Sequence, residues 1–202
     1  ALIVNSVFAG NTGDSAPAVS AGFGGIYALN SVFYGNSTRI TGGAVGIGEG
    51  GATIRNCTFW GNSGPSGFSQ MAQFYSIGNN IDIDYSIVQG WTGSWGGQGN
   101  SGVDPLFVDP NGSDGIPGTE DDDLRLSAGS PPNNAGDPRT TGLPPTDLDG
   151  HARVLCGRID VGAIEFGIGD FDCDRATARV DFAQWADCMT GPTSSCTGCP
   201  AF

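Results

Sequence analysis

The nine-residue segment IVNSVFAGN, residues 3–11, recurs three more times in the first ninety residues. The later copies are ALNSVFYGN from Ala28, IRNCTFWGN from Ile54 and IDYSIVQGW from Ile83. The equivalent positions Asn5, Asn30, Asn56 and Tyr85 lie 25, 26 and 29 residues apart. Sequence periods of roughly 20–50 residues indicate stacked structural units. The segment therefore predicts an all-β fold, a right-handed parallel β-helix (solenoid) in which each copy forms part of one coil.

The repeat also predicts which side chains stack. Because each coil buries its apolar face only against its neighbours, residues in phase should lie over one another inside the solenoid. The expected inward columns are Ser6, Ser31, Cys57, Ser86 and Phe8, Phe33, Phe59, Val88. Asn5, Asn30 and Asn56 are expected to form a ladder in which each amide binds the backbone of the neighbouring coil.

Composition agrees with a solenoid that has many tight turns. Glycine accounts for 35 of the 202 residues, and charged residues for only 14%. Glycine adopts positive φ at little steric cost, which suits such turns. A β-sandwich is the alternative fold, but sandwiches rarely keep a long period with the same residues in phase.

Charge is distributed unevenly along the chain. The net charge is −13, the basic residues are all arginine, and 17 of the 21 acidic residues follow residue 103. Such density repels nucleic acid and anionic lipid and attracts divalent cations. We therefore expect no nucleic-acid partner. No apolar run is long enough for a membrane span, and the opening on an expected strand at Ala1–Val4 suggests a processed or truncated product.

The repeat resembles a known class of surface protein. NCTFWGNS, with GGIY from Gly24 and GGAV from Gly42 between the copies, is similar to the right-handed β-helix repeats of bacterial surface proteins, including polymorphic outer-membrane-protein-like repeats. The resemblance covers residues 1–90. It implies an extracellular or cell-surface location and this fold, but no particular activity, since the fold also serves polysaccharide lyases.

A second resemblance covers residues 103–166. The pieces DPLF, DLRL, GSP, AGD, DLDG-x-x-R and DVGAIE are similar to the choice-of-anchor Q region that ends β-helical surface proteins. The chain departs from that pattern at Pro132-Asn133-Asn134. We therefore divide the chain into β-helix coils at 1–102, an acidic cap at 103–166, and a tail at 167–202.

The acidic cap contains a candidate calcium loop. Seven oxygen-bearing side chains fall within 15 residues, namely Asp109, Asn111, Asp114, Glu120, Asp121, Asp122 and Asp123. Calcium takes about 6–8 oxygen ligands from flexible loops of this kind. The alternative is a solvated acidic loop without a bound ion.

Residues 169–192 resemble one half of a dockerin type I module. The resemblance implies a calcium loop with ligands from Asp170, Asp172, Asp174, the Ala176 carbonyl and Asp181, followed by an amphipathic helix. The chain departs from the pattern at Arg175, Thr177 and Ala178, where the family has glycine, an aliphatic residue and a side-chain oxygen. A complete dockerin has two halves, so this half alone does not imply binding to a cohesin.

Six cysteines divide into two groups. Cys57, in the inward column, is expected to be a buried free thiol that behaves as a small apolar residue. Close cysteines in an extracellular tail usually form disulfides, and the candidates are Cys156, Cys173, Cys188 and Cys196. Cys188 with Cys196 is the preferred pair, although the spacing leaves the pairing open. Zinc binding at Cys196-x-x-Cys199 is the alternative, but it lacks a second ligand pair.

The functional hypothesis is a structural or adhesive surface segment stabilised by calcium, self-associating end to end into filaments or packed against neighbouring coils of a larger protein. An enzyme is not expected, although further N-terminal coils could carry catalysis. Asp82 and Asp84 share one strand face but have no partner in the repeat alignment. The alternatives are a fragment of a polysaccharide lyase or hydrolase, and a non-catalytic module that stacks glycans on Tyr34 and Trp60.

Overall fold

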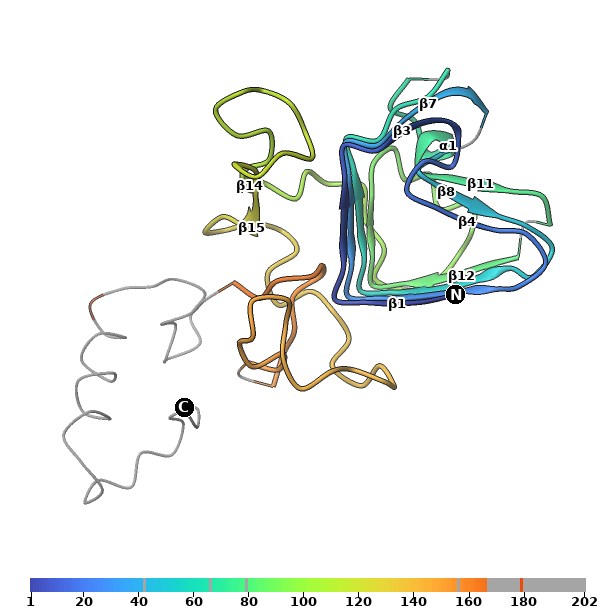
Figure 1. Ribbon diagram of the computed structural model, residues 1–202. Coiled ribbons are helices and arrows are strands. Elements are labelled where there is room, and N and C mark those ends of the chain that lie inside the picture. Colours follow the sequence, from blue (N-terminus) through green and yellow to red (C-terminus); the bar gives the residue numbers. More distant parts are fainter. Residues whose placement is uncertain (42, 66, 79, 156, 167–178, 180–202) are drawn as a thin grey trace.

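The computed structural model describes residues 1–166 apart from 42, 66, 79 and 156, together with residue 179. Within these residues the chain folds as a parallel β-helix, as the repeat predicts (Figure 1). The candidate calcium ligands between residues 170 and 181 and all the disulfide candidates lie outside the described residues.

All four coils contribute one strand to each of the first two parallel sheets, three coils contribute to the third sheet and two to the fourth. The first sheet contains β1 (Leu2–Val4), β5 (Ile26–Leu29), β9 (Ala52–Arg55) and β12 (Ile81–Asp84). The second contains β2 (Val7–Ala9), β6 (Val32–Tyr34), β10 (Thr58–Trp60) and β13 (Ile87–Val88). The third contains β4 (Val19–Ala21), β8 (Val45–Ile47) and β11 (Phe74–Ser76). The fourth contains β3 (Thr12–Ser15) and β7 (Ser37–Thr41).

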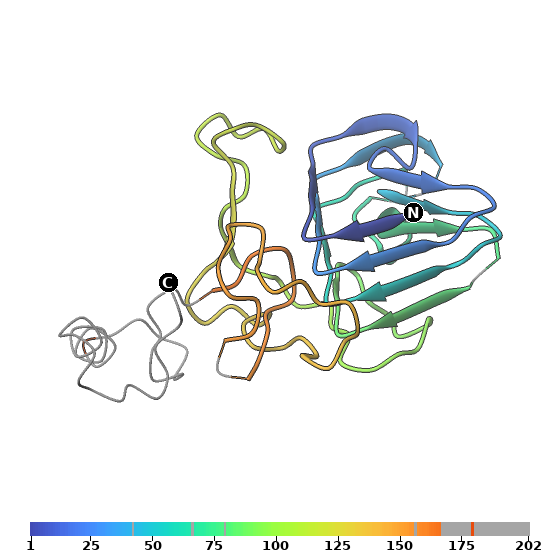
Figure 2. The ribbon, with the colours of Figure 1, turned by 60° about the horizontal axis from the view of Figure 1, so that its bottom comes forward.

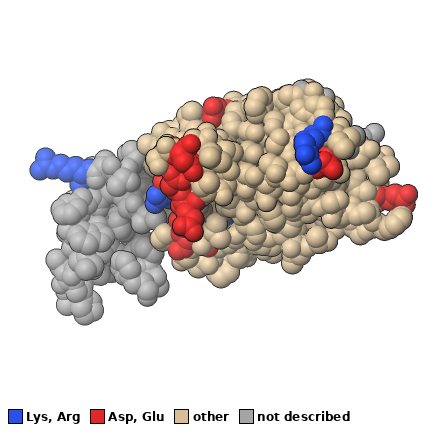
Figure 3. Space-filling view, turned by 45° about the horizontal axis from the view of Figure 1, so that its top comes forward, with Lys and Arg blue, Asp and Glu red and all other residues tan. Residues whose placement is uncertain are grey.

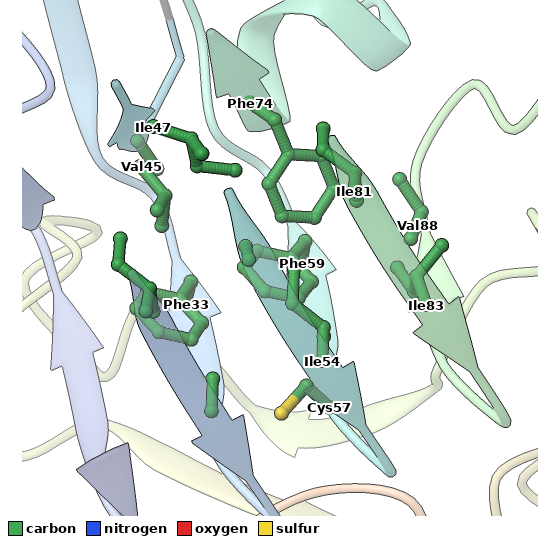
Figure 4. Packing of buried hydrophobic residues seen from close by; sticks show 14 of the residues in the cluster. Phe33, Val45, Ile47, Ile54, Cys57, Phe59, Phe74, Ile81, Ile83 and Val88 are labelled. Carbon is green, nitrogen blue, oxygen red and sulfur yellow. The ribbon is translucent and has the colours of Figure 1, made fainter. Parts of the chain in front are cut away.

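The inward columns lie as predicted. Phe8, Phe33 and Phe59 are register partners in the second sheet, and their rings stack at centroid distances of 5.1 and 4.5 Å. Val88 continues the column against Phe59. Cys57 is fully buried in the same core as a free thiol (Figure 4), and burial raises its pKa to about 12.

The predicted ladder of Asn5, Asn30 and Asn56 is wrong. These residues occupy the bend between the first and second sheets with φ of 45°, 45° and 53°. Positive φ is strained for most side chains but accessible to asparagine, which accounts for the recurrence. Their amides do not bind neighbouring coils: Asn5 and Asn56 bind residues beyond position 136, and the amide of Asn30 has no partner among the described residues.

The asparagine ladder lies instead at the end of the repeat. Asn11 donates from its backbone N–H and Nδ2 to Asn36 Oδ1, at 3.0 and 2.8 Å. Asn36 donates in the same way to Asn62 Oδ1, at 2.9 and 2.8 Å. Asn36 Nδ2 also donates to the Phe8 carbonyl, so its amide joins three successive coils.

One end of the stack is closed by residues 91–101 (Figure 2). The backbone N–H groups of Tyr85 and Val88 donate to the carbonyls of Gln98 and Ser101. Trp91 and Trp95 pack against the apolar core, and the Trp95 ring lies 5.1 Å from that of Phe74. Phe74 follows α1 (Gln70–Gln73), a single short helix in the third coil.

The region of residues 103–166, here called the flanking region, lies along the side of the stack (Figure 1). Its two strands, β14 (Phe107–Asp109) and β15 (Asp123–Leu126), pair antiparallel, and the rest is irregular. It covers the outward face of the second sheet with an apolar contact among Val32, Tyr34, Leu124 and Ala163. Side chains of the second sheet therefore alternate between two cores.

The two asparagine positions should respond differently to substitution. Replacing fully buried Asn36 with alanine should lower the free energy of unfolding by about 2–4 kcal/mol, since hydrogen bonds to two neighbouring coils are lost. Asn30→Gly should change it by less than about 1 kcal/mol, because glycine accepts positive φ and the amide makes no hydrogen bond. Urea denaturation measures both. Equal losses would contradict the distinction drawn between the two columns.

Candidate functional site

A buried arginine joins the flanking region to the solenoid. Arg153 is fully buried, and its Nη1 donates to Glu165 Oε1 at 2.6 Å and to the Gly162 carbonyl at 3.2 Å. Its Nη2 donates to Asn5 Oδ1 at 2.5 Å and to the Ala163 carbonyl at 2.7 Å. One guanidinium therefore fixes the bend of the first coil against residues 162–165.

Three buried carboxylates belong to the same hydrogen-bonded network, and Glu165 is the one that pairs with Arg153. Glu165 Oε2 accepts from the Asp160 backbone N–H at 2.9 Å, and Asp147 Oδ2 accepts from the Glu165 N–H at 2.9 Å. Asp160 accepts from the N–H groups of Asn134 and Phe166. We call Asp147, Arg153, Asp160 and Glu165 the buried ion cluster. Its carboxylates satisfy backbone donors of the flanking region, which has little regular structure to do so.

Two asparagines of the solenoid complete the junction. Asn5 Nδ2 donates to the Thr146 carbonyl at 2.6 Å. Asn56 Oδ1 accepts from the Asp137 N–H at 2.9 Å, and the Asn56 carbonyl accepts from the Gly162 N–H at 2.9 Å. The bend that requires positive φ thus also presents its amides to residues more than 80 positions away.

In the buried ion cluster, the carboxyl groups of Asp160 and Glu165 resist ionisation. Burial and the neighbouring Asp160 charge together raise the pKa of Glu165 to about 8, against the opposing effect of Arg153. Burial likewise raises the pKa of Asp160 to about 6. In a site of low dielectric constant the charged form is penalised unless it is fully paired.

The sequence contains a signal for the buried ion cluster that the resemblance to the choice-of-anchor Q region does not explain. Arg153 lies between Ala152 and Val154, and Asp160 lies between Ile159 and Val161. Glu165 likewise follows Ile164. A charged residue flanked by apolar ones in a segment without regular structure is a candidate for a buried ion pair. Arg153 and Glu165 lie 12 positions apart in a segment without regular structure, so the sequence could not pair them.

The carboxylates of the acidic loop mostly bind donors of the loop itself. Asp121 Oδ2 accepts from the Ser113 N–H and hydroxyl, both at 2.7 Å, and Oδ1 accepts from the Thr119 hydroxyl at 2.7 Å. These bonds lower the pKa of Asp121 below its ordinary value. Asp122 accepts from the Gly118 N–H and Asp114 from the Ile116 N–H.

The other candidate ligands of the loop point to different partners. Asn111 Oδ1 accepts from the Tyr34 hydroxyl at 3.1 Å, Asp123 pairs with Arg125 at 2.5 Å, and Asp109 lies at the end of β14. Among the residues that the structure describes, no three acidic, histidine or cysteine side chains converge as a metal site. In this arrangement the loop carboxylates do not form a calcium cage, although acidic side chains gather in a narrow band on one face (Figure 3).

The two candidate glycan-stacking residues lie under the flanking region. Tyr34 is 9% exposed, and its ring meets Phe107 edge-on at a centroid distance of 5.7 Å. Trp60, its register partner, is partly buried against the same apolar contact. The structure therefore places both rings where they support the flanking region.

Charged residues of the solenoid do have partners in neighbouring coils, so that part of the prediction is wrong. Arg55 is the register partner of Asp84 and lies 3.4 Å from it, and 2.6 Å from Asp82. Arg39 pairs with Asp14 at 2.8 Å across the fourth sheet. Arg55 and Asp84 hold the same position in successive copies of the repeat, so the alignment already contained this pair, whereas Arg39 and Asp14 lie outside the aligned segments.

The buried ion cluster makes stability depend on pH. The folded protein holds protons on Glu165 and Asp160 that an unfolded chain with ordinary pKa values has released. The free energy of unfolding should therefore fall as the pH rises from about 4.5 to about 8. Glu165→Gln should flatten this slope, whereas exposed Glu49→Gln should keep it. Urea denaturation across this range measures both, and a wild-type stability that rises with pH would contradict the assignment.

Comparisons with known proteins give no match for this chain. No family model matches it, and neither a curated protein nor a solved structure does. Over the described part of the chain, no helix is both long and apolar enough to cross a membrane. The buried ion cluster and the solenoid geometry are therefore the basis for the functional proposal.

Proposed function

We propose that the chain is a structural segment of an extracellular surface protein, of the kind that supports adhesion. The observation that carries the proposal is the burial of the ion cluster. Arg153, Asp160 and Glu165 are 0%, 2% and 4% exposed, so solvent and substrates do not reach them. Groups with pKa values shifted in this way often mark catalytic sites, but here they are sealed within a junction. Their effect is to fix the flanking region on the solenoid.

The surface charges of the coils also favour a structural role over catalysis. Lyases and hydrolases that act on polysaccharides need a base or paired carboxylates that are free to react. Arg55 is held by Asp82 and Asp84, and Asp84 also accepts from the Gln98 N–H at 2.6 Å. Such pairs are already neutralised. An extracellular location is supported by the repeat pattern in the sequence.

Calcium remains part of the proposal, assigned to the tail. The alternation of Asp170, Asp172 and Asp174, with Asp181 after them, is the pattern that supports it. The acidic loop is a weaker candidate because its carboxylates already bind local donors. Binding to the folded state alone would add about 2.7 kcal/mol of stability when free calcium exceeds its dissociation constant a hundredfold.

The structural role can be tested by limited proteolysis with the matched pair Arg153→Met and Arg139→Met. The wild-type protein should survive a broad-specificity protease as a fragment that spans the solenoid and the flanking region. Arg153→Met should be cut within residues 103–166 and lose about 3–5 kcal/mol of stability, because three carboxylates lose their buried counter-charge. Arg139 forms an exposed pair with Asp137, so Arg139→Met should behave like the wild type.

Two results would contradict the structural proposal. One is rapid cleavage of the wild-type protein within the flanking region. The other is release of new reducing ends or unsaturated sugars from pectin, alginate or related polysaccharides. Glycan-array binding that is lost in Trp60→Ala would favour a carbohydrate-binding module instead.

Calcium binding can be located by thermal melting with and without a chelator. Calcium should raise the melting temperature, and Asp170→Asn with Asp172→Asn should abolish the increase. The matched pair Asp121→Asn with Asp122→Asn in the acidic loop should retain it. If only the Asp121→Asn, Asp122→Asn variant loses the calcium-dependent rise in melting temperature, the calcium site lies in the acidic loop. If calcium does not change the melting temperature of the wild-type protein, the calcium part of the proposal is wrong.

A further inference from the structure

The polar ladders inside the solenoid run in one direction. The Ser6 N–H donates to Ser31 Oγ at 3.2 Å, and the Cys57 N–H donates to Ser86 Oγ at 3.1 Å. In the asparagine ladder, Asn11 and Asn36 donate to the Oδ1 atoms of Asn36 and Asn62. At both positions the side-chain oxygen of a coil accepts from the coil before it, and the donor of that coil reaches the side-chain oxygen of the coil after it. Asn36 and Asn62 also donate from Nδ2 to the carbonyls of Phe8 and Phe33 in the preceding coil.

At the closed end of the stack, dedicated residues supply the last acceptors. Asn100 Oδ1 accepts from the Ser86 N–H at 3.0 Å and so ends the serine ladder. Gln73 Oε1 accepts from Asn62 Nδ2 at 2.7 Å and ends the asparagine ladder. The donors that leave the final coils are therefore satisfied within the chain.

In the first coil, by contrast, the side-chain acceptors of both ladders receive no hydrogen bond from the described residues. Ser6 Oγ donates to the Val4 carbonyl, and Asn11 Nδ2 donates to Asn36 Oδ1 and the Ala9 carbonyl. Their hydrogens are thus in use, while neither Ser6 Oγ nor Asn11 Oδ1 accepts a hydrogen bond from any described residue. Each of β1, β2, β3 and β4 is the last strand of its sheet on this side.

The backbone of the first coil also has hydrogen-bonding groups without partners on this side. Tyr27, Val32 and Ser37 donate their N–H groups to the preceding coil, at the carbonyls of Ala1, Ser6 and Asn11. Their register partners in the first coil are Leu2, Val7 and Thr12. The N–H groups of these three partners therefore face the side on which no described strand lies. The half-buried Phe8 ring ends the aromatic stack on the same side.

We propose that this face docks one further parallel β-helix coil with the same Asn-Ser-x-Phe-x-Gly-Asn repeat. Such a coil would place its serine N–H over Ser6 Oγ, its final asparagine over Asn11 Oδ1 and its phenylalanine over Phe8. This inference rests on the structural role proposed above, and it identifies the partner by the side chains of its repeat. The occupant is defined by this repeat and by its place directly before the first coil of the stack.

A second copy of this chain fits the face poorly. In a head-to-tail filament, the tail would be the end closed by residues 91–101, where Asn100 and Gln73 already bind the ladder donors. In a face-to-face dimer, the acceptors Ser6 Oγ and Asn11 Oδ1 would meet acceptors, and the strands would not run parallel. The side-chain acceptors Ser6 Oγ and Asn11 Oδ1 therefore favour neither arrangement.

The docking can be tested by extending the full chain with a copy of residues 26–51 placed directly before Ala1. Because Leu2 is the register partner of Tyr27 and Ile26 that of Ala52, Ala1 stands level with Ile26 and Ala52, so joining Gly51 to Ala1 repeats the native Gly51–Ala52 junction. The added coil should raise the melting temperature by at least about 5 °C. It should also slow amide exchange of Leu2, Val7 and Thr12 by at least about 100-fold. Ser6→Ala should reduce the gain more than it affects the unextended chain.

The matched control is an extension with the same 26 residues in scrambled order, which should give neither effect. A native extension that performs no better than the scrambled one would overturn the proposal. So would sedimentation of the unextended chain as a dimer that the extension abolishes, since the occupant would then be a second copy. If the extension gives no stabilisation but the wild-type protein resists proteolysis, the docking proposal is wrong and the structural role is retained. If the protein cleaves a polysaccharide, the structural role is wrong, and the docking result is unaffected.

Discussion

The structure depends on one constraint, which is that polar side chains buried between coils gain most when they bind the neighbouring coils. Asn36 shows this most clearly, because its single amide accepts from Asn11 and donates to Asn62 and to the Phe8 carbonyl. A buried amide without partners costs about 1–3 kcal/mol, so such positions tolerate few alternatives. Because the side-chain oxygens of the serine and asparagine ladders accept from the coil before them, the stack has a direction and its two ends are chemically different.

In the flanking region, buried charged side chains bind the backbone polar groups that regular secondary structure would otherwise satisfy. Its irregular backbone leaves many N–H and carbonyl groups to satisfy, and Asp147, Asp160 and Glu165 bind several of them. Burying three carboxylates would be prohibitive without Arg153, and even with it the pKa values of Asp160 and Glu165 rise. Replacement of such clusters by apolar residues is often neutral or stabilising. Their value is to specify one arrangement of the irregular chain on the solenoid.

The sequence predicted the solenoid because phase and period are properties of the chain alone. Phe8, Phe33 and Phe59 recur with the coil length, and stacking follows from that recurrence. The sequence could not distinguish Asn5 from Asn11, since both recur with the same period. One position is selected by positive φ at a bend and the other by hydrogen bonds between coils. The junction was hidden for a different reason, since Arg153 and Asn5 are 148 positions apart and only the fold brings them together.

The two halves of the chain meet at the coil that most needs support. In a repeat protein, a terminal coil has a neighbour on one side only and is the first to open. Burial follows this order, since Ile3 is 7% exposed and its counterpart Ile54 is 1% exposed. Yet Asn5 is held by Arg153 and the Thr146 carbonyl, and Pro117 packs so closely on Gly10 that a Cβ there would lie 1.9 Å from its carbonyl oxygen. Residues from the C-terminal half thus fasten the first coil from its side. That support leaves the strand edges and acceptors of the first coil uncovered, so it stabilises the coil without blocking the face on which another coil would dock.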